Sequence, residues 1–373
     1  MLHLAWRNLL QNRARLAVSL GGVGLALTLI LSFDAIVEGA QQRLTAYIDE
    51  SGADLFVSQQ GVRNMHMASS TLPASVVDEV RRVPGVEAAT PILYVTSMVA
   101  AGDGRYLAYV IGLPTDATMG RPWQIVSGSP IPGPGEAIID RTVADQAGVS
   151  VGDRVTVLGE ELTVAGLADG TANIVNSIAF ISFEDFARLR GGSPVVSYVL
   201  VKVAPGESPD AVSRRIEASV GGVTALTRDA FAREERQLVR DMMTDVISIM
   251  NLVGFSIGLS VVALTVYIAT FARRAEFGVL KAVGAGNGHL YRVVIAQALL
   301  SVALGLAIGL AFTLTLTAVV PRAAPELTLA VSGSSVAKVA AVSLLIAGLS
   351  AILPIRQIAG LDPAIVFRGG VTR

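Results

Sequence analysis

Four stretches of the chain are long and apolar enough to cross a lipid bilayer, and this feature limits the fold more than any other. A membrane-spanning helix needs about 20 mainly apolar residues. The four stretches lie at about 16–37, 246–271, 293–320 and 336–355, and the segment between the first two has ordinary soluble character. The sequence therefore predicts four transmembrane helices with a large mixed α/β domain inserted between the first and the second.

The composition agrees with a membrane protein. Hydrophobic residues make up 52% of the chain and charged residues only 16%, whereas soluble domains carry about 25% charged residues. The net charge of −1 gives no basis for binding nucleic acid. The chain has no cysteine, which excludes disulfides, thiolate metal sites and cysteine nucleophiles.

No pattern for catalysis or for cofactor binding is found in the sequence. A phosphate-binding loop of the form G-x-x-x-x-G-K-[ST] needs a lysine after a glycine, and none of the three lysines follows one. The histidines are far apart and offer no paired metal or triad site. The three lysines are Lys202, Lys281 and Lys338, and the three histidines are His3, His66 and His289. We therefore expect no catalytic, cofactor or metal site in this chain, and ATP and Mg would be bound by another protein.

The placement of basic residues predicts the orientation in the membrane. The positively charged side of a membrane protein is cytoplasmic. The loop between the third and fourth spans carries only Arg322, whereas the other flanks carry Arg7, Arg13, Arg15, Arg273, Arg274, Lys281, Arg292, Arg356 and Arg368. We expect a multi-pass protein of a bacterial inner (plasma) membrane, with both termini in the cytoplasm and the inserted domain outside.

The expected segments follow from this orientation. An amphipathic interfacial helix is expected at 1–13, and the membrane segments are expected at 14–38, 241–272, 290–320 and 336–356, with an outer loop at 321–335 and a cytoplasmic tail at 357–373. The outer domain at 39–240 is expected to have two subdomains, one at about 53–130 and 193–227 and the other inserted at about 131–192. No Pro or Gly interrupts 227–252, so the stalk and the second span should form one helix, with 233–236 solvated.

Small residues in the spans predict close helix packing. The second and third spans each contain a G-x-x-x-G pattern, formed by Gly254 and Gly258 and by Gly305 and Gly309. Glycines at this spacing let helix backbones approach each other. The pattern fits packing within the subunit and packing between two subunits equally well. Lys338, near the outer end of the fourth span, is expected to extend toward the membrane surface.

The cytoplasmic segment 273–289 is the most informative one. Its first part, 273–285, reads R-R-A-E-F-G-V-L-K-A-V-G-A, which predicts a short helix ended by Gly284. Phe277 and Leu280 are expected on one face, flanked by Glu276 and Lys281. An apolar face in the cytoplasm needs a groove in which to bury itself. The alternative is a helix that rests on lipid.

This segment resembles the pattern R-R-x-E-I-G-[IV]-L-[KR]-A-[LIV]-G-A of the MacB/FtsX/LolC/LolE superfamily of ABC-transporter permeases, with Phe277 where isoleucine is usual. The end of the chain, P-I-R-Q-I-A-G-L-D-P-A-I-V-F-R at 354–368, is similar to the ending of family members, with Ile365 in place of the usual Glu. The opening W-R-N-L at 6–9 also fits. The resemblance implies a permease subunit that is not itself an enzyme.

The resemblance also implies partners and a mechanism. Two copies of an ABC ATPase would dock on the coupling helix, and a second permease copy would complete a homodimer or a heterodimer. The coupling residues would be Arg274, Glu276, Phe277, Gly278, Leu280, Lys281 and Gly284. Movement would pass to the outer domain and drive export or release of a substrate, with a periplasmic adaptor or an extracytoplasmic substrate protein as a further partner. The alternative is a regulator, similar to FtsX, of an extracytoplasmic cell-wall hydrolase.

Overall fold

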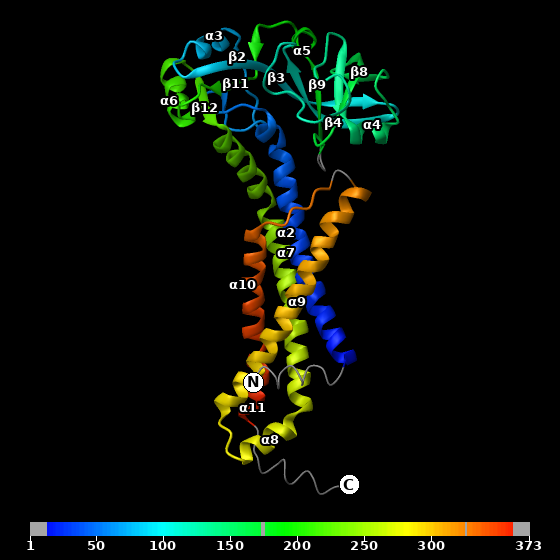
Figure 1. The fold of residues 1–373 in the computed structure, drawn as a ribbon, viewed down its shortest axis with the longest axis vertical. Helices are drawn as coiled ribbons and strands as arrows, with labels where there is room; N and C mark the ends of the chain where they lie inside the picture. The colour runs from blue at the N-terminus through cyan, green and yellow to red at the C-terminus, as the bar shows by residue number, and fades with distance from the viewer. Residues whose placement is uncertain (1–12, 173–175, 325–326, 361–373) are drawn as a thin grey trace. The chain divides into compact units, whose positions relative to one another are not determined.

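The computed structural model describes residues 13–172, 176–324 and 327–360 and divides them into two compact units (Figure 1). The helical unit takes its described residues from Met1–Gly39, Met243–Ala323 and Leu329–Arg373. The α/β unit consists of Ala40–Met242 and Ala324–Thr328. All but the last residue of the interfacial helix expected at 1–13, and most of the tail expected at 357–373, lie outside the described residues.

The four expected spans are all helical. They lie in α2 (Arg13–Glu50), α7 (Arg228–Ala272), α9 (Asn287–Ala323) and α10 (Gly333–Ser350), followed by α11 (Ile352–Ala359). Helices α2, α7 and α9 each contain a stretch that is long and apolar enough to cross a membrane, and the fourth such stretch, Gly333–Ala359, runs over α10 and α11 together. The expected continuity of stalk and span is confirmed, because α2 and α7 each run unbroken across the boundary between the two units.

The fourth span differs from the expected single helix at 336–356. The structure ends α10 at Ser350 and begins α11 at Ile352. Pro354 has no backbone N–H, so it cannot make the helical hydrogen bond to the carbonyl oxygen of Ser350. The chain therefore changes helix at Ala351, close to the expected end of the span.

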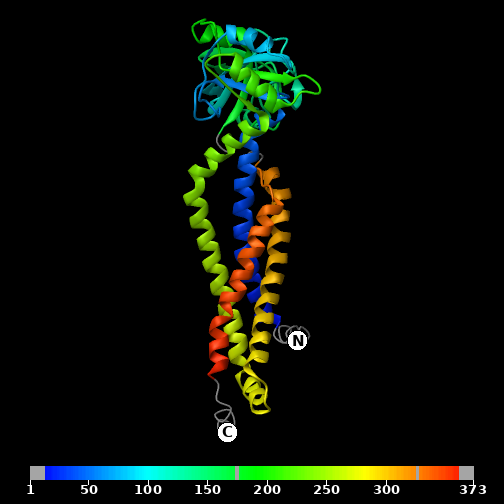
Figure 2. The same cartoon turned by 90° about the vertical axis from the view of Figure 1, so that its left-hand side faces the viewer.

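The helices of the helical unit run alongside one another (Figure 2) and share one apolar core. Aliphatic side chains from all four long helices meet there: Val23 and Leu27, Val262 and Val266, Val294 and Ala298, and Val339 and Ile346. Burying a side chain of this size contributes about 1.5–3 kcal/mol where it is removed from water. Within a membrane, close packing and interhelical contacts replace much of that contribution.

The α/β unit is built on a ten-stranded mixed sheet with the order β12-β1-β11-β3-β4-β9-β6-β8-β5, and β7 pairs with β3 and β8. Pairs β4–β9 and β6–β8 are parallel. The strands are β1 (Leu55–Gln59), β3 (Val86–Ala101), β4 (Gly104–Leu113), β5 (Ile125–Gly128), β6 (Glu136–Asp140), β7 (Arg154–Val157), β8 (Glu160–Ala168), β9 (Ser177–Ser182), β11 (Tyr198–Val203) and β12 (Val223–Thr227). A separate pair joins β2 (Leu72–Pro73) to β10 (Val195–Val196).

Short helices cover the sheet (Figure 1). Helices α3 (Ser75–Arg81) and α6 (Pro209–Ser219) lie near one end and share a valine-rich core with β1 and β11. Helices α4 (Arg141–Ala147) and α5 (Phe183–Leu189) pack in a second core, which they share with β4, β6 and β9.

The sheet is continuous, and the subdomain boundary expected at 131 does not separate these cores. Val99 and Val110, on the N-terminal side of that position, pack in one cluster with Val157 and Ile181 on its C-terminal side. The physical reason is the length of β3, whose first half pairs with β11 and whose second half pairs with β4. One long strand therefore belongs to both parts of the domain.

The N-terminal end of α7 is part of the core of the α/β unit. Phe231 is fully buried and stacks on Phe56 of β1, with 4.8 Å between the ring centroids and 3° between the ring planes. Tyr198 of β11 packs edge-on against Phe231 at 6.1 Å. Aromatic pairs of this kind contribute about 0.5–1.5 kcal/mol beyond their buried area. The start of α7 is thus firmly fixed to the sheet.

Candidate functional site

The expected coupling helix is α8 (Arg274–Ala282), which begins two residues after α7 ends. The guanidinium carbon of Arg274 lies 4.6 Å from the centroid of the Phe271 ring, a cation–π contact between α8 and the end of α7. Glu276 is exposed and lies 3.6 Å from Arg273. Gly284 has φ +96°, so the predicted glycine terminator is confirmed.

Phe277 was expected to fill a groove on the ATPase, and this expectation is wrong. Its side chain is only 7% exposed and belongs to the same buried cluster as Leu290 of α9 and Ile358 of α11. The neighbouring Gly278 is buried as well. The face of α8 that carries Phe277 covers the ends of two other helices, so the large ring is buried within its own chain.

The opposite side of α8 presents the exposed residues. Leu280 is 46% exposed, Val279 is 46% exposed and Val283, just past the helix end, is 83% exposed. With Glu276 they lie at positions i, i+3, i+4 and i+7, which share one helix face. We call Val279, Leu280 and Val283 the apolar face of α8. Val279 and Val283 were not among the residues predicted from the sequence, although their spacing around Leu280 indicates a shared helix face.

Lys281 connects α8 to α11. Its ammonium group donates hydrogen bonds to the carbonyl oxygens of Ile358 at 2.9 Å and Ala359 at 3.1 Å. The last carbonyls of a helix have no partner within the helix and attract cations. Lys281 therefore acts within this chain, as a cap on the C-terminal end of α11.

The four glycines of the G-x-x-x-G patterns lie at helix contacts inside the subunit. A Cβ atom added at Gly254 would approach Ile30 to 2.4 Å, and one added at Gly305 would approach Val23 to 2.4 Å. At Gly258 the nearest atom would belong to Ile346 at 3.0 Å, and at Gly309 it would be the backbone nitrogen of Thr28 at 3.1 Å. The G-x-x-x-G patterns could serve packing within one subunit or between two subunits, and these contacts correspond to packing within one chain.

Lys338, which was expected to extend toward the membrane surface, makes a contact within the helical unit. Its ammonium nitrogen lies 2.9 Å from Oδ1 of Asp34, so it forms an ion pair between α10 and α2. The carboxylate of Asp34 is largely buried, with 11% of its side chain exposed. A charge with so little exposure needs a partner, and Lys338 supplies it.

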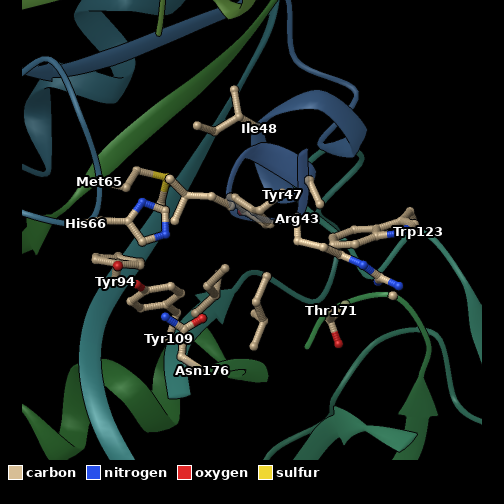
Figure 3. Close-up of a pocket in the computed structure, with 15 residues that line it drawn as sticks. Arg43, Tyr47, Ile48, Met65, His66, Tyr94, Tyr109, Trp123, Thr171 and Asn176 are labelled. Atoms are coloured by element: carbon tan, nitrogen blue, oxygen red, sulfur yellow. The ribbon is translucent and has the colours of Figure 1, made fainter. Parts of the chain in front are cut away.

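A pocket lies within the α/β unit, between the C-terminal part of α2 and the sheet (Figure 3). Met65 and His66 lie near Tyr94 and Tyr109 on one side, and Arg43 and Trp123 lie on the other. The space open to water-sized molecules is about 20 Å³, which holds about one water molecule. The side chains thus nearly fill this pocket.

The tyrosines of the pocket are buried and neutral. Burial raises the pKa of Tyr109 to about 12 and raises the pKa of Tyr47 and of Tyr94 still further. The buried hydroxyl of Tyr47 has no hydrogen-bond partner among the residues that the structure describes. These phenols therefore carry no charge at physiological pH and cannot act as anions there.

The structure reveals a buried contact beside this pocket that the sequence analysis missed. Glu235 of α7, expected to be solvated, is fully buried, so that expectation is wrong. Its carboxyl group accepts a hydrogen bond from the backbone N–H of Met65 at 2.7 Å and shares a second one with Nδ1 of His66. His66 and Glu235 are 169 residues apart, and no local pattern in a single sequence indicates such a pair.

Comparisons with known families cover both units. Residues 16–219 match the model of the MacB-like periplasmic core domain. Residues 248–363 match the model of the FtsX-like permease C-terminal domain. The first match includes more than half of the chain, and the second includes α8, α9, α10 and α11.

Known ABC transporter proteins are similar over nearly the whole chain, and a solved structure is similar over about half of it. An uncharacterized ABC transporter permease of Mycobacterium bovis is 24% identical over 371 residues, which cover 99% of this chain and 100% of that protein. The macrolide export ATP-binding/permease protein MacB of Hahella chejuensis is 22% identical over 398 residues, 96% of this chain and 58% of that protein. The periplasmic region of MacB from Actinobacillus actinomycetemcomitans has a TM-score of 0.38 and 11% identity, covering 49% of this chain and 94% of that one. The chain therefore belongs to the MacB/FtsX-like superfamily of ABC transporter permeases.

Proposed function

We propose that this permease transmits ATP-driven movement of separate ATPase subunits to its α/β unit, and that it thereby drives export or release of a substrate outside the cytoplasmic membrane. The observation that carries the proposal is helix α7. It runs unbroken for 45 residues, a length of about 68 Å. Its first turns are fixed in the core of the α/β unit by Phe231, and its last residue lies next to α8.

The apolar face of α8 is the proposed docking surface for the ATPase. Membership of an ABC transporter family implies an ATPase partner, and this chain offers no phosphate-binding loop of its own. Apolar side chains exposed to the cytoplasm favour a partner with a complementary groove. In this proposal ATP and Mg are bound by two ATPase copies, and a second permease copy completes the complex.

The proposed orientation places α8 in the cytoplasm. The segment between α7 and α9 carries Arg273, Arg274 and Lys281, and basic residues favour the cytoplasmic side. The α/β unit, which follows the first span, is then extracytoplasmic, and both termini are cytoplasmic. This orientation puts the docking surface for the ATPase and the α/β unit at opposite ends of α7.

A break in α7 tests the proposal. Gln237 is exposed on this helix, and proline there costs about 3 kcal/mol of local helix stability. The complex of permease and ATPase in lipid nanodiscs would be compared with and without a non-hydrolysable ATP analogue, with backbone hydrogen exchange in the α/β unit as the readout. Gln237→Ala is the matched control.

We expect Gln237→Pro to retain the ATPase while the α/β unit no longer responds to the nucleotide. The control should respond as the wild type does. A full response of the α/β unit in the Gln237→Pro variant would show that a continuous α7 is not the transmitting element.

A further inference from the structure

Three consecutive residues of α7 contact two other parts of the α/β unit, the loop 61–67 and helix α2. Glu234 forms an exposed ion pair with Arg63, at 2.5 Å. The next residue, Glu235, holds the backbone of Met65 and the ring of His66. Arg236 donates a hydrogen bond to Oγ1 of Thr45 on α2, at 3.0 Å. The loop 61–67 and helix α2 are thus both tied to one turn of α7.

The middle contact differs from its neighbours in burial. Glu235 is fully buried, whereas the side chains of Glu234 and Arg63 are 35% and 53% exposed. Exposed ion pairs contribute little because water screens them. Removing one partner of a buried, hydrogen-bonded charge is strongly destabilising, because the other group is left without a partner. Of the two contacts between α7 and the loop, the one made by Glu235 therefore contributes more to stability.

The geometry of the pair also fixes the position of the loop. Nδ1 of His66 and Oε1 of Glu235 share one hydrogen bond, so the ring and the carboxyl group can pair in only one relative position. The His66 ring also meets the ring of Tyr109 edge-on, at a centroid distance of 4.4 Å. His66 therefore has a polar contact to α7 and an aromatic contact to β4, and a shift along α7 would disturb the hydrogen bond to Glu235.

We propose that Glu235 and His66 are positioning residues that make the loop 61–67, and with it one wall of the pocket, follow movements of α7. The inference rests on the proposed function, because it names where the movement of α7 enters the α/β unit. The other wall of the pocket comes from α2, which contributes Arg43 and Tyr47. A displacement of the loop toward or away from α2 therefore changes the width of the pocket.

Hydrogen exchange in the complete permease–ATPase complex tests this assignment. Glu235→Ala removes both hydrogen bonds, and Glu234→Ala is the matched control on the adjacent residue. Glu235→Gln is the conservative variant, because its amide oxygen accepts from Met65 N–H and its amide N–H donates to the other tautomer of His66. Exchange of amides in 61–67 and in the first turns of α7 is measured with and without the ATP analogue.

We expect the loop and α7 of the wild type to respond to the nucleotide together. In Glu235→Ala, loop amides should exchange on the order of tenfold faster or more, and their nucleotide response should be lost while that of α7 remains. Glu234→Ala and Glu235→Gln should behave as the wild type. Loss of the loop response in Glu235→Gln as well would contradict positioning by hydrogen bonds.

Two further outcomes separate this inference from the proposed function. If α7 and the loop still respond together in Glu235→Ala, the positioning role is refuted and the proposed function stands. If neither α7 nor the loop of the wild type responds to the nucleotide, transmission through α7 is refuted, and the positioning role is refuted with it. Should Glu235→Ala fail to accumulate, His66→Ala gives the same comparison from the other partner.

Discussion

Lys281 of α8 donates a hydrogen bond to the carbonyl oxygen of Ile358 in the last turn of α11. The side chain of Ile358 lies in the same buried cluster as Phe277, so the two helices meet through a polar and an apolar contact. Helix α11 follows directly on α10. A force applied to α8 therefore acts on α7 through chain continuity and on α11 through these contacts.

The cap formed by Lys281 leads to the first prediction. Lys281→Met keeps the apolar stem but removes the hydrogen-bond donor, so the contact between α8 and α11 should weaken by about 0.3–1 kcal/mol. We expect faster hydrogen exchange of the amides in α8 and in the last turn of α11. Lys281→Arg keeps a donor and a positive charge and should stay close to the wild type. Equal exchange in the Met variant and the wild type would show that the cap does not hold α8.

Helix packing in the helical unit gives the second prediction. Alanine at Gly305 would bring Cβ to 2.4 Å from Val23, and overpacking of this kind costs about 1–3 kcal/mol. Alanine at Gly348, which has no atom within 4 Å of the added Cβ, should be neutral or stabilising, because alanine favours helix more than glycine does. Thermal unfolding in detergent would compare the two variants. A Gly305→Ala protein as stable as Gly348→Ala would refute the close contact between α2 and α9.

Asp185 gives a prediction on pH. Burial works to raise its pKa, but hydrogen bonds from Arg188, the backbone of Gly135 and Ser182 outweigh burial, and the pKa is lowered from 3.8. Because the pKa is lower in the folded state, this stabilisation is complete above the unfolded value and is lost as the pH falls through the folded value.

Asp185→Asn should therefore lower the free energy of unfolding at neutral pH, by about 1.5–3 kcal/mol, and the difference from the wild type should shrink in acid. Chemical unfolding of the full chain in detergent, between about pH 3 and pH 7, measures this difference. The exposed turn residue Asp103, changed to Asn, is the control. A difference that stays constant with pH would contradict the assigned role of the carboxylate.

Orientation gives the fourth prediction. Ser193 and Asn287 are exposed, and the chain has no cysteine of its own. A cysteine at Ser193 should react with a membrane-impermeant thiol reagent on intact cells, or on spheroplasts if an outer membrane intervenes. A cysteine at Asn287 should react only after permeabilisation. Labelling of the Asn287 site on intact cells would reverse the proposed orientation.

Some features of the fold can be predicted from one sequence because they are local. The length of each apolar stretch predicts the four spans, and the absence of Pro and Gly from 227–252 predicts the continuity of α7. Gly284 is predicted as a helix terminator because few other residues adopt its positive φ. In each case the cause lies within a few residues of the effect.

Other features depend on contacts between distant segments and could not be predicted in this way. The pattern in α8 shows that Phe277 lies on an apolar face, but only the positions of α9 and α11 decide that this face is covered. Glu235 lies in a run of charged residues that is typical of a solvated helix surface. Its burial follows from the path of the loop that carries Met65 and His66.

The central claim is that the apolar face of α8 binds the ATPase. Burying Leu280 in a groove would contribute about 1.5–3 kcal/mol, and an aspartate there would also place an unpaired carboxylate in an apolar contact. The test is co-purification of the ATPase with a Leu280→Asp, Val283→Asp double variant. Asn287→Asp, which adds a carboxylate on the same segment away from this face, is the control.

We expect the double variant to reach the membrane in wild-type amounts but to lose the ATPase, with binding weakened on the order of 100-fold or more. The control should retain the ATPase. If the double variant retains the ATPase at the wild-type level, the apolar face of α8 is not the docking surface, and the account of coupling through α8 is wrong.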